Sequence, residues 1–228
     1  MSEKRGPGCL QIAVGITALA MLASLLVPTL GRTARRGNII IGINNARQVI
    51  TELRLYSSDH DGKYPDALLH EPNSSNEVFQ VLFKKGIIEN EMVFGCPVSP
   101  FEPDGRIGSK PDFARALEPG ENHWAMTPGL SDSARGSIPL VYESPAVATW
   151  PPKWNPDAKG KLVKGRAWSN GIIIGMNDSS VAIQPLEAKE GSEVMLKKVQ
   201  DEKDLFELAN SSATSAGWRV LDVEVKSK

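Results

Sequence analysis

The stretch Gly6–Gly31, which reads GPGCLQIAVGITALAMLASLLVPTLG, decides the fold expected for this chain. It contains no Asp, Glu, Lys, Arg or His, and its apolar part runs from Cys9 to Leu30. A helix of about 22 residues spans roughly 33 Å, close to the roughly 30 Å hydrocarbon core of a bilayer. Basic residues flank the stretch on both sides. The sequence therefore predicts a transmembrane helix over residues 7–31.

Three other interpretations of this stretch remain open. A cleaved secretory signal shares the basic start, but its apolar core usually covers about 7 to 15 residues. A buried core helix of a soluble domain seldom has so long a charge-free run. A lipoprotein signal is not favoured, because the apolar run follows Cys9 instead of preceding it.

Composition limits the possible functions. The formal net charge of −1 gives no bulk attraction to nucleic acid, so we expect no nucleic-acid partner. The two cysteines, Cys9 and Cys96, have no metal-type spacing with histidine, and a disulfide between the membrane segment and the domain is implausible. We expect no metal and no cofactor. Proline and glycine gather between about 95 and 170, which predicts long loops over 97–170.

The apolar helix is expected to continue as an amphipathic extension over 32–58. Apolar residues recur there at spacings of four, three, four and three, which places them on one helical face. They are Ile39, Ile43, Ala46, Ile50 and Leu53. We expect this face to pack on the domain's own sheet, in preference to a partner.

The N-terminus resembles that of type IV pilin-like proteins, in particular the pseudopilins of type II secretion. In that family a basic leader ends in Gly, and an apolar helix containing a Pro follows. In this chain Gly6 falls at the residue before the processing site and Pro7 at the usual aromatic. Gln11 falls at the usual Glu, and Pro28 at the helix proline.

Later segments resemble the same family more loosely. They are Asn44-Asn45-Ala46-Arg47-Gln48, the turn from Asp59 to Pro65, Phe94-Gly95-Cys96-Pro97, and 128–143. The resemblance implies an α+β fold in which a long N-terminal transmembrane and amphipathic helix packs on a small antiparallel sheet. It also implies a single pass through the inner (cytoplasmic) membrane of a bacterial envelope, with the N-terminus cytoplasmic and the C-terminal domain outside.

The function implied by this resemblance is structural. The chain would be a non-enzymatic subunit or accessory of a type II secretion or pilus-like machine, with membrane lipid, itself or other pilin-like subunits as partners. Pro7 would leave a secondary amine after cleavage, and neutral Gln11 cannot form the family's ion pair within the membrane. We therefore hypothesise that the helix stays unprocessed.

The chain is expected to divide into a basic leader-like start (1–6), the transmembrane helix (7–31), its extension (32–58) and an exported α+β domain (59–228). Within the domain we expect a helix over 76–85, strands over 138–143, 171–176 and 181–184, a helix over 192–210 and a strand over 218–225. The role of the segment from 187 to 228 is not indicated.

Few residues indicate chemistry. Asp59 and Asp61 resemble the start of a calcium loop, but His70 stands where a Glu ligand is required. His123, beside a Trp in a loop, is more typical of surface packing. No catalytic motif appears, so we expect no enzyme.

Trp150 and Trp154 flank a Pro-Pro-Lys segment and are candidate binding residues, although burial of both rings is favoured. They define the alternative function, an unprocessed membrane-anchored binding module that recognises a protein or glycan through the 97–170 loops. An envelope hydrolase is the third possibility.

Overall fold

The computed structural model describes residues 9–210 and 217–226, and within the first helix it describes side chains at positions 14, 17 and 21 and from 36 onward. The elements, in chain order, are α1 (Cys9–Ser58), η1 (Pro65–Leu68), α2 (Ser75–Lys84), η2 (Glu91–Phe94), β1 (Trp124–Met126), β2 (Pro139–Glu143), η3 (Pro156–Ala158), β3 (Ile172–Met176), β4 (Val181–Gln184) and α3 (Leu205–Asn210). The chain forms two units, Met1–Ile40 and Ile41–Lys228, so the boundary lies within α1.

The expected membrane span is not found. In the described part of the chain, no helix combines the length and the apolar character needed to cross a bilayer. The transmembrane helix over 7–31 and the single-pass inner-membrane location are therefore wrong. So is the pilin-like fold class built on a long N-terminal transmembrane helix.

The unit Ile41–Lys228 is an α+β domain around one antiparallel sheet. Its four strands follow one another in the order β1-β2-β3-β4, each antiparallel to the next. The strands expected at 138–143, 171–176 and 181–184 are confirmed as β2, β3 and β4. A turn joins β3 to β4, in which Ser179 has a φ of 71° and the Met176 N–H donates to the Ser180 carbonyl.

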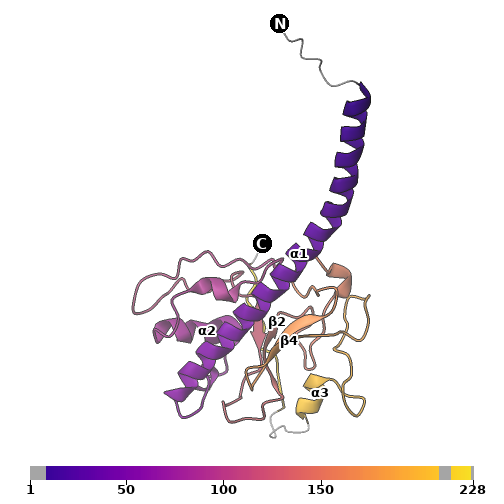
Figure 1. Cartoon of the computed structure of the whole chain (residues 1–228). Helices are drawn as coiled ribbons and strands as arrows, with labels where there is room; N and C mark the ends of the chain where they lie inside the picture. The colour runs from indigo at the N-terminus through magenta and orange to yellow at the C-terminus, as the bar shows by residue number, and fades with distance from the viewer. Residues whose placement is uncertain (1–8, 211–216, 227–228) are drawn as a thin grey trace. The chain divides into compact units, whose positions relative to one another are not determined.

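The part of α1 that belongs to this unit, from Ile41 onward, covers one face of the sheet (Figure 1). Ala46, Ile50 and Leu53 are fully buried, which confirms the expected apolar face and its packing on the domain's own sheet. Two glycines permit the close approach. A Cβ on Gly42 would lie 2.6 Å from Ile173 Cδ1, and a Cβ on Gly175 would lie 2.2 Å from Ile50 Cδ1.

The opposite face of the sheet carries an aromatic core. Because side chains alternate along a strand, Ile172 and Ile174 face away from α1. They belong to a buried cluster with Tyr142, Trp154 and Phe206. The Tyr142 ring meets the edges of the other two aromatic rings, with centroids 6.4 Å and 5.0 Å apart. The long loop between β2 and β3 therefore contributes to the core through Trp154.

Helices α2 and α3 begin at side-chain caps. Ser74 Oγ accepts from the Glu77 N–H, and Glu77 Oε2 accepts from the Asn73 N–H, so α2 starts with a reciprocal cap. The helix expected over 76–85 is confirmed. The one expected over 192–210 is restricted to α3, because Asp204 Oδ1 accepts from the N–H groups of Phe206 and Glu207 and starts the helix there.

The segment around Leu221 lies along the outer edge of β1. Leu221 and Met126 exchange two backbone hydrogen bonds, of 3.0 Å and 2.9 Å. Beyond this bridge, the Ser75 N–H donates to the Asp222 carbonyl, and the Gly120 N–H donates to the Glu224 carbonyl. The strand expected over 218–225 is thus replaced by one isolated bridge within an extended segment.

Candidate functional site

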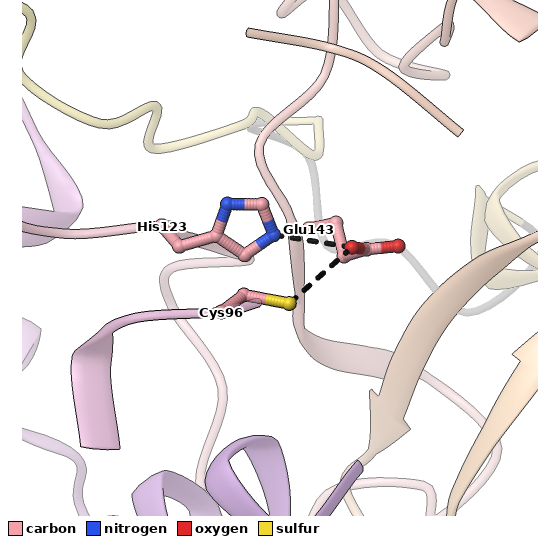
Figure 2. Close-up of side chains that lie close together, drawn as sticks. All are labelled: Cys96, His123 and Glu143. Atoms are coloured by element: carbon pink, nitrogen blue, oxygen red, sulfur yellow. Dashed lines mark hydrogen bonds and ion pairs between the residues drawn. The ribbon is translucent and has the colours of Figure 1, made fainter. Parts of the chain in front are cut away.

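A fully buried carboxylate, Glu143, gathers the polar side chains of the domain at the end of β2. Its Oε1 accepts from His123 Nε2 at 3.1 Å, Trp168 Nε1 at 3.0 Å and Arg166 Nη2 at 3.3 Å. Cys96 Sγ lies 3.8 Å from the same oxygen. Figure 2 shows the imidazole and the thiol converging on this oxygen. These five residues are called the Glu143 cluster below.

The fold brings the five residues together from four segments of the chain. Cys96 follows η2, and that turn is held to α1 by Asn45 Nδ2, which donates to the Gly95 carbonyl at 3.0 Å. His123 immediately precedes β1, whose register pairs Trp124 with Glu143. The segment 166–168 leads into β3, where the Ile173 N–H donates to Glu143 Oε2 at 2.8 Å. The carboxylate therefore connects the sheet to three loops.

His123 is held neutral. Burial lowers its pKa below the ordinary value, although the hydrogen bond to Glu143 opposes that shift. Its other nitrogen, Nδ1, lies 2.9 Å from Ser99 Oγ, which in turn accepts from the Phe101 N–H. These contacts suit a ring that donates from Nε2 to Glu143 and accepts at Nδ1 from the Ser99 hydroxyl.

Arg166 supplies the positive charge of the cluster. It is 1% exposed, and its Nη2 donates to the Pro97 carbonyl at 3.1 Å as well as to Glu143. The guanidinium carbon lies 4.1 Å from the centre of the Trp168 ring, a cation–π contact. Burial acts to raise the pKa of Glu143, but the His123 hydrogen bond and the Arg166 charge outweigh it and keep that pKa below its usual range. Glu143 and Arg166 thus form an ion pair in the core.

Cys96, His123 and Glu143 each place one possible ligand atom within 4.8 Å of the others, which raises the question of a metal. Zinc requires a thiolate, whereas burial, together with the Glu143 charge, raises the pKa of Cys96 well above its ordinary value. Arg166 Nη2 lies 3.7 Å from the sulfur and 3.3 Å from the carboxylate oxygen, so a cation already occupies this side of the ligands. The residues present do not fit a metal ion.

A second group of carboxylates, Glu91, Asp104 and Glu121, also lies close together. Both oxygens of Glu91 are already used, because Oε1 accepts from the Leu117 N–H at 2.5 Å and Oε2 from the Gly105 N–H at 2.9 Å. These bonds hold the loop between η2 and β1. The group is therefore explained by the structure of the loop.

Of the candidate residues from the sequence, the structure describes the side chains of Trp150 and Trp154, and it brings both rings against Phe206. Gly6 and Pro7 lie outside the described residues, and Gln11 and Pro28 lie within α1 at positions whose side chains are not described. Trp154 is fully buried, and its Nε1 donates to the Glu143 carbonyl.

Trp150 is partly buried against Phe206 and Trp218, with ring centroids 5.0 Å and 6.1 Å away. It therefore lies beside the aromatic core instead of standing free in the loop. His123 is buried in the Glu143 cluster, where surface packing was expected.

Sequence reasoning missed Glu143 and Arg166. The available signal for Glu143 was a charged residue at the end of the apolar strand Pro139-Leu140-Val141-Tyr142.

Comparison of the chain with protein-family models, with curated proteins and with solved structures found no match.

Proposed function

We propose that this chain is a non-catalytic, pilin-like subunit, structural or accessory, of a type II secretion or pilus-like machine, and that it assembles through the N-terminal part of α1. The resemblance of its first residues to pilin-like proteins supports this function. Two features of the described residues also support it. They are the burial of the Glu143 cluster and the exposed apolar side chains of α1.

The Glu143 cluster supports a non-catalytic role. Cys96, His123, Glu143 and Arg166 are each at most 8% exposed. The thiol is neutral, the imidazole is neutral, and the carboxylate is paired with the guanidinium, so no member is poised as a nucleophile or a base for a substrate. Such a network specifies how loops join the sheet.

The observation that carries the proposal is the exposed apolar surface of α1 in the unit Met1–Ile40. Val14 and Met21 are 62% and 63% exposed, and Thr17 between them is also exposed. Spacings of three and four residues place these positions on one helical face. Burying aliphatic surface contributes about 25 cal/mol per Å², so this face gains free energy by packing against a second copy or a related subunit.

Oxidative crosslinking tests the proposal. In a Cys9→Ser background, Thr17→Cys places a thiol on the exposed face, and Leu55→Cys places a matched thiol on an exposed position of the same helix within the domain. We expect crosslinked dimers and higher species from position 17 only. Val14→Asp with Met21→Asp should abolish them.

Two outcomes would contradict assembly through this face. One is a chain that stays monomeric in sedimentation at high concentration without crosslinking at position 17. The other is equal crosslinking at positions 17 and 55, which would indicate random collision. An intact-mass measurement on the same samples reports separately whether the chain begins at Met1 or Pro7.

The alternative function, recognition of a protein or glycan by the tryptophans of the 97–170 loops, has less support. Trp154 is fully buried and Trp150 packs on Phe206 and Trp218. Their rings are engaged in the core, so we do not propose them as a ligand platform.

A further inference from the structure

The loop from Asn155 to Arg166 closes on itself. The Asn155 N–H donates to the Gly165 carbonyl at 2.7 Å, and Asn155 forms a backbone bridge with Arg166. The Asn155 side chain accepts from the Ala158 N–H and caps η3. Because Arg166 is fixed in the Glu143 cluster, both ends of this loop are anchored in the core.

The tip of this loop combines aliphatic and basic side chains in water. Leu162 and Val163 are 62% and 42% exposed. Lys159 and Lys161 are exposed beside them, while Lys164 is paired with Asp222. The segment 158–166 contains no acidic residue. Apolar side chains that stay exposed to water lower the solubility of a protein and often mark a binding site. Because both ends of the loop are anchored, Leu162 and Val163 are held at its tip.

We propose that this tip binds the surface of an anionic lipid bilayer, with Leu162 and Val163 entering the headgroup region and Lys159 and Lys161 contacting lipid phosphates. Lysine stems can lie along apolar surface while the ammonium groups stay at the polar boundary. Shallow insertion of apolar side chains beside basic ones is the usual physical basis of peripheral membrane contact. This inference is independent of the proposed assembly function.

The size of the tip favours lipid over a protein partner. A stable protein interface buries about 800 Å² on each partner, far more than two aliphatic side chains provide. A bilayer requires no complementary shape, because its headgroups rearrange around an inserted side chain. Each lysine near an anionic surface strengthens partitioning about fivefold, the equivalent of about 1 kcal/mol.

A local probe tests the inference on the full chain. In a Cys9→Ser background, Val163→Cys carries an environment-sensitive NBD fluorophore, and Val199→Cys, at another exposed valine, is the matched control. Vesicles contain either 70% phosphatidylcholine with 30% phosphatidylglycerol or phosphatidylcholine alone. We expect a blue shift and a several-fold rise in emission at position 163 with the anionic vesicles, and no change at position 199.

Replacing Lys159 and Lys161 together by Gln should raise the vesicle concentration needed for half the signal about 25-fold, from two fivefold losses. Raising the salt to 0.5 M should weaken the response as well. Circular dichroism confirms that the variants are folded. No response at position 163, an equal response at positions 163 and 199, or a response unaffected by the lysine replacements would each overturn the inference. A response to polyglutamate but not to vesicles would overturn it in favour of an acidic protein partner.

Discussion

The Arg166 guanidinium lies 3.3 Å from the Glu143 carboxylate, and each side chain is 1% exposed. Two opposite charges thus neutralise one another in the interior, where either alone would be strongly destabilising. Arg166 is not fully satisfied, since its Nε and Nη1 have no hydrogen-bond partner among the described residues. The pair therefore matters more for joining the 150–168 loop to the sheet than for net stability.

Breaking this pair from one side should be costly. We expect Arg166→Met to lower the free energy of unfolding by about 3 to 5 kcal/mol, because it leaves a buried carboxylate without its cation. Urea denaturation measures the effect. The double variant Arg166→Met with Glu143→Gln should lose less than the sum of the two single variants, and strict additivity would contradict a coupled pair.

Acid should destabilise the domain through His123. Burial lowers the pKa of His123 in the folded state, so the unfolded chain binds the proton first as the pH falls below about 6.5. Stability is therefore complete above that pH and decreases below it, by up to about 1.4 kcal/mol per pH unit for one proton. The lowered pKa of Glu143 acts in the same direction below about pH 4.3.

Urea midpoints between pH 7.5 and 5.5 check this prediction. His123→Gln should remove most of the decrease, whereas His70→Gln, at an exposed position, should leave it unchanged. An undiminished decrease in the His123 variant would show that another group is responsible.

Cys96 should be an unreactive thiol in the native protein. It is 8% exposed, and burial, with the Glu143 charge, raises its pKa, so thiolate is scarce at neutral pH. In a Cys9→Ser background we expect reaction with a disulfide reagent to be at least about 100-fold slower than in 8 M urea, given both burial and thiol protonation. Equal rates would mean that the Glu143 cluster opens readily.

The contact between α1 and β3 should depend on glycine. An added Cβ at Gly175 would lie 2.2 Å from Ile50 Cδ1, and Ile50 is itself fully buried. We expect Gly175→Ala to destabilise the domain by about 1 to 3 kcal/mol, the usual cost of overpacking a core. Thermal unfolding measures this, with Gly37→Ala as the control, because a Cβ there meets nothing within 4 Å. Destabilisation by the control instead would contradict the packing argument.

Local signals predicted the elements whose cause is local. The strand β2 follows from an apolar run, and β3 and β4 follow from two apolar runs separated by a turn. The helix α2 follows from its cap at Ser74 and the glycine after Lys85. α3 is shorter than composition suggested, because Asp201 and Glu202 adopt positive φ angles that are incompatible with a continuous helix. The prediction of an N-terminal membrane span, which rested on hydropathy, flanking basic residues and a family resemblance, was wrong.

The Glu143 cluster could not be predicted from spacing. Residues that contact one another in the cluster are far apart in the sequence. His123 and Glu143 are 20 residues apart, and Cys96 and Arg166 are 70 residues apart. The strand register places His123 beside Glu143, and the turn that α1 holds through Asn45 brings Cys96 to them, so the cluster depends on the folded domain. His123 was expected at the surface, since a lone histidine in a loop carries no sign of a buried partner.

The bridge between Leu221 and Met126 has a consequence for synthesis of the protein. Residues 221–224 leave the ribosome after all four strands, so the outer edge of β1 stays unpaired while they are still inside the exit tunnel. An open strand edge is a site at which nascent chains on neighbouring ribosomes can pair with one another. Binding by a chaperone such as a ribosome-associated holdase would be most valuable in that interval, before this segment closes the sheet.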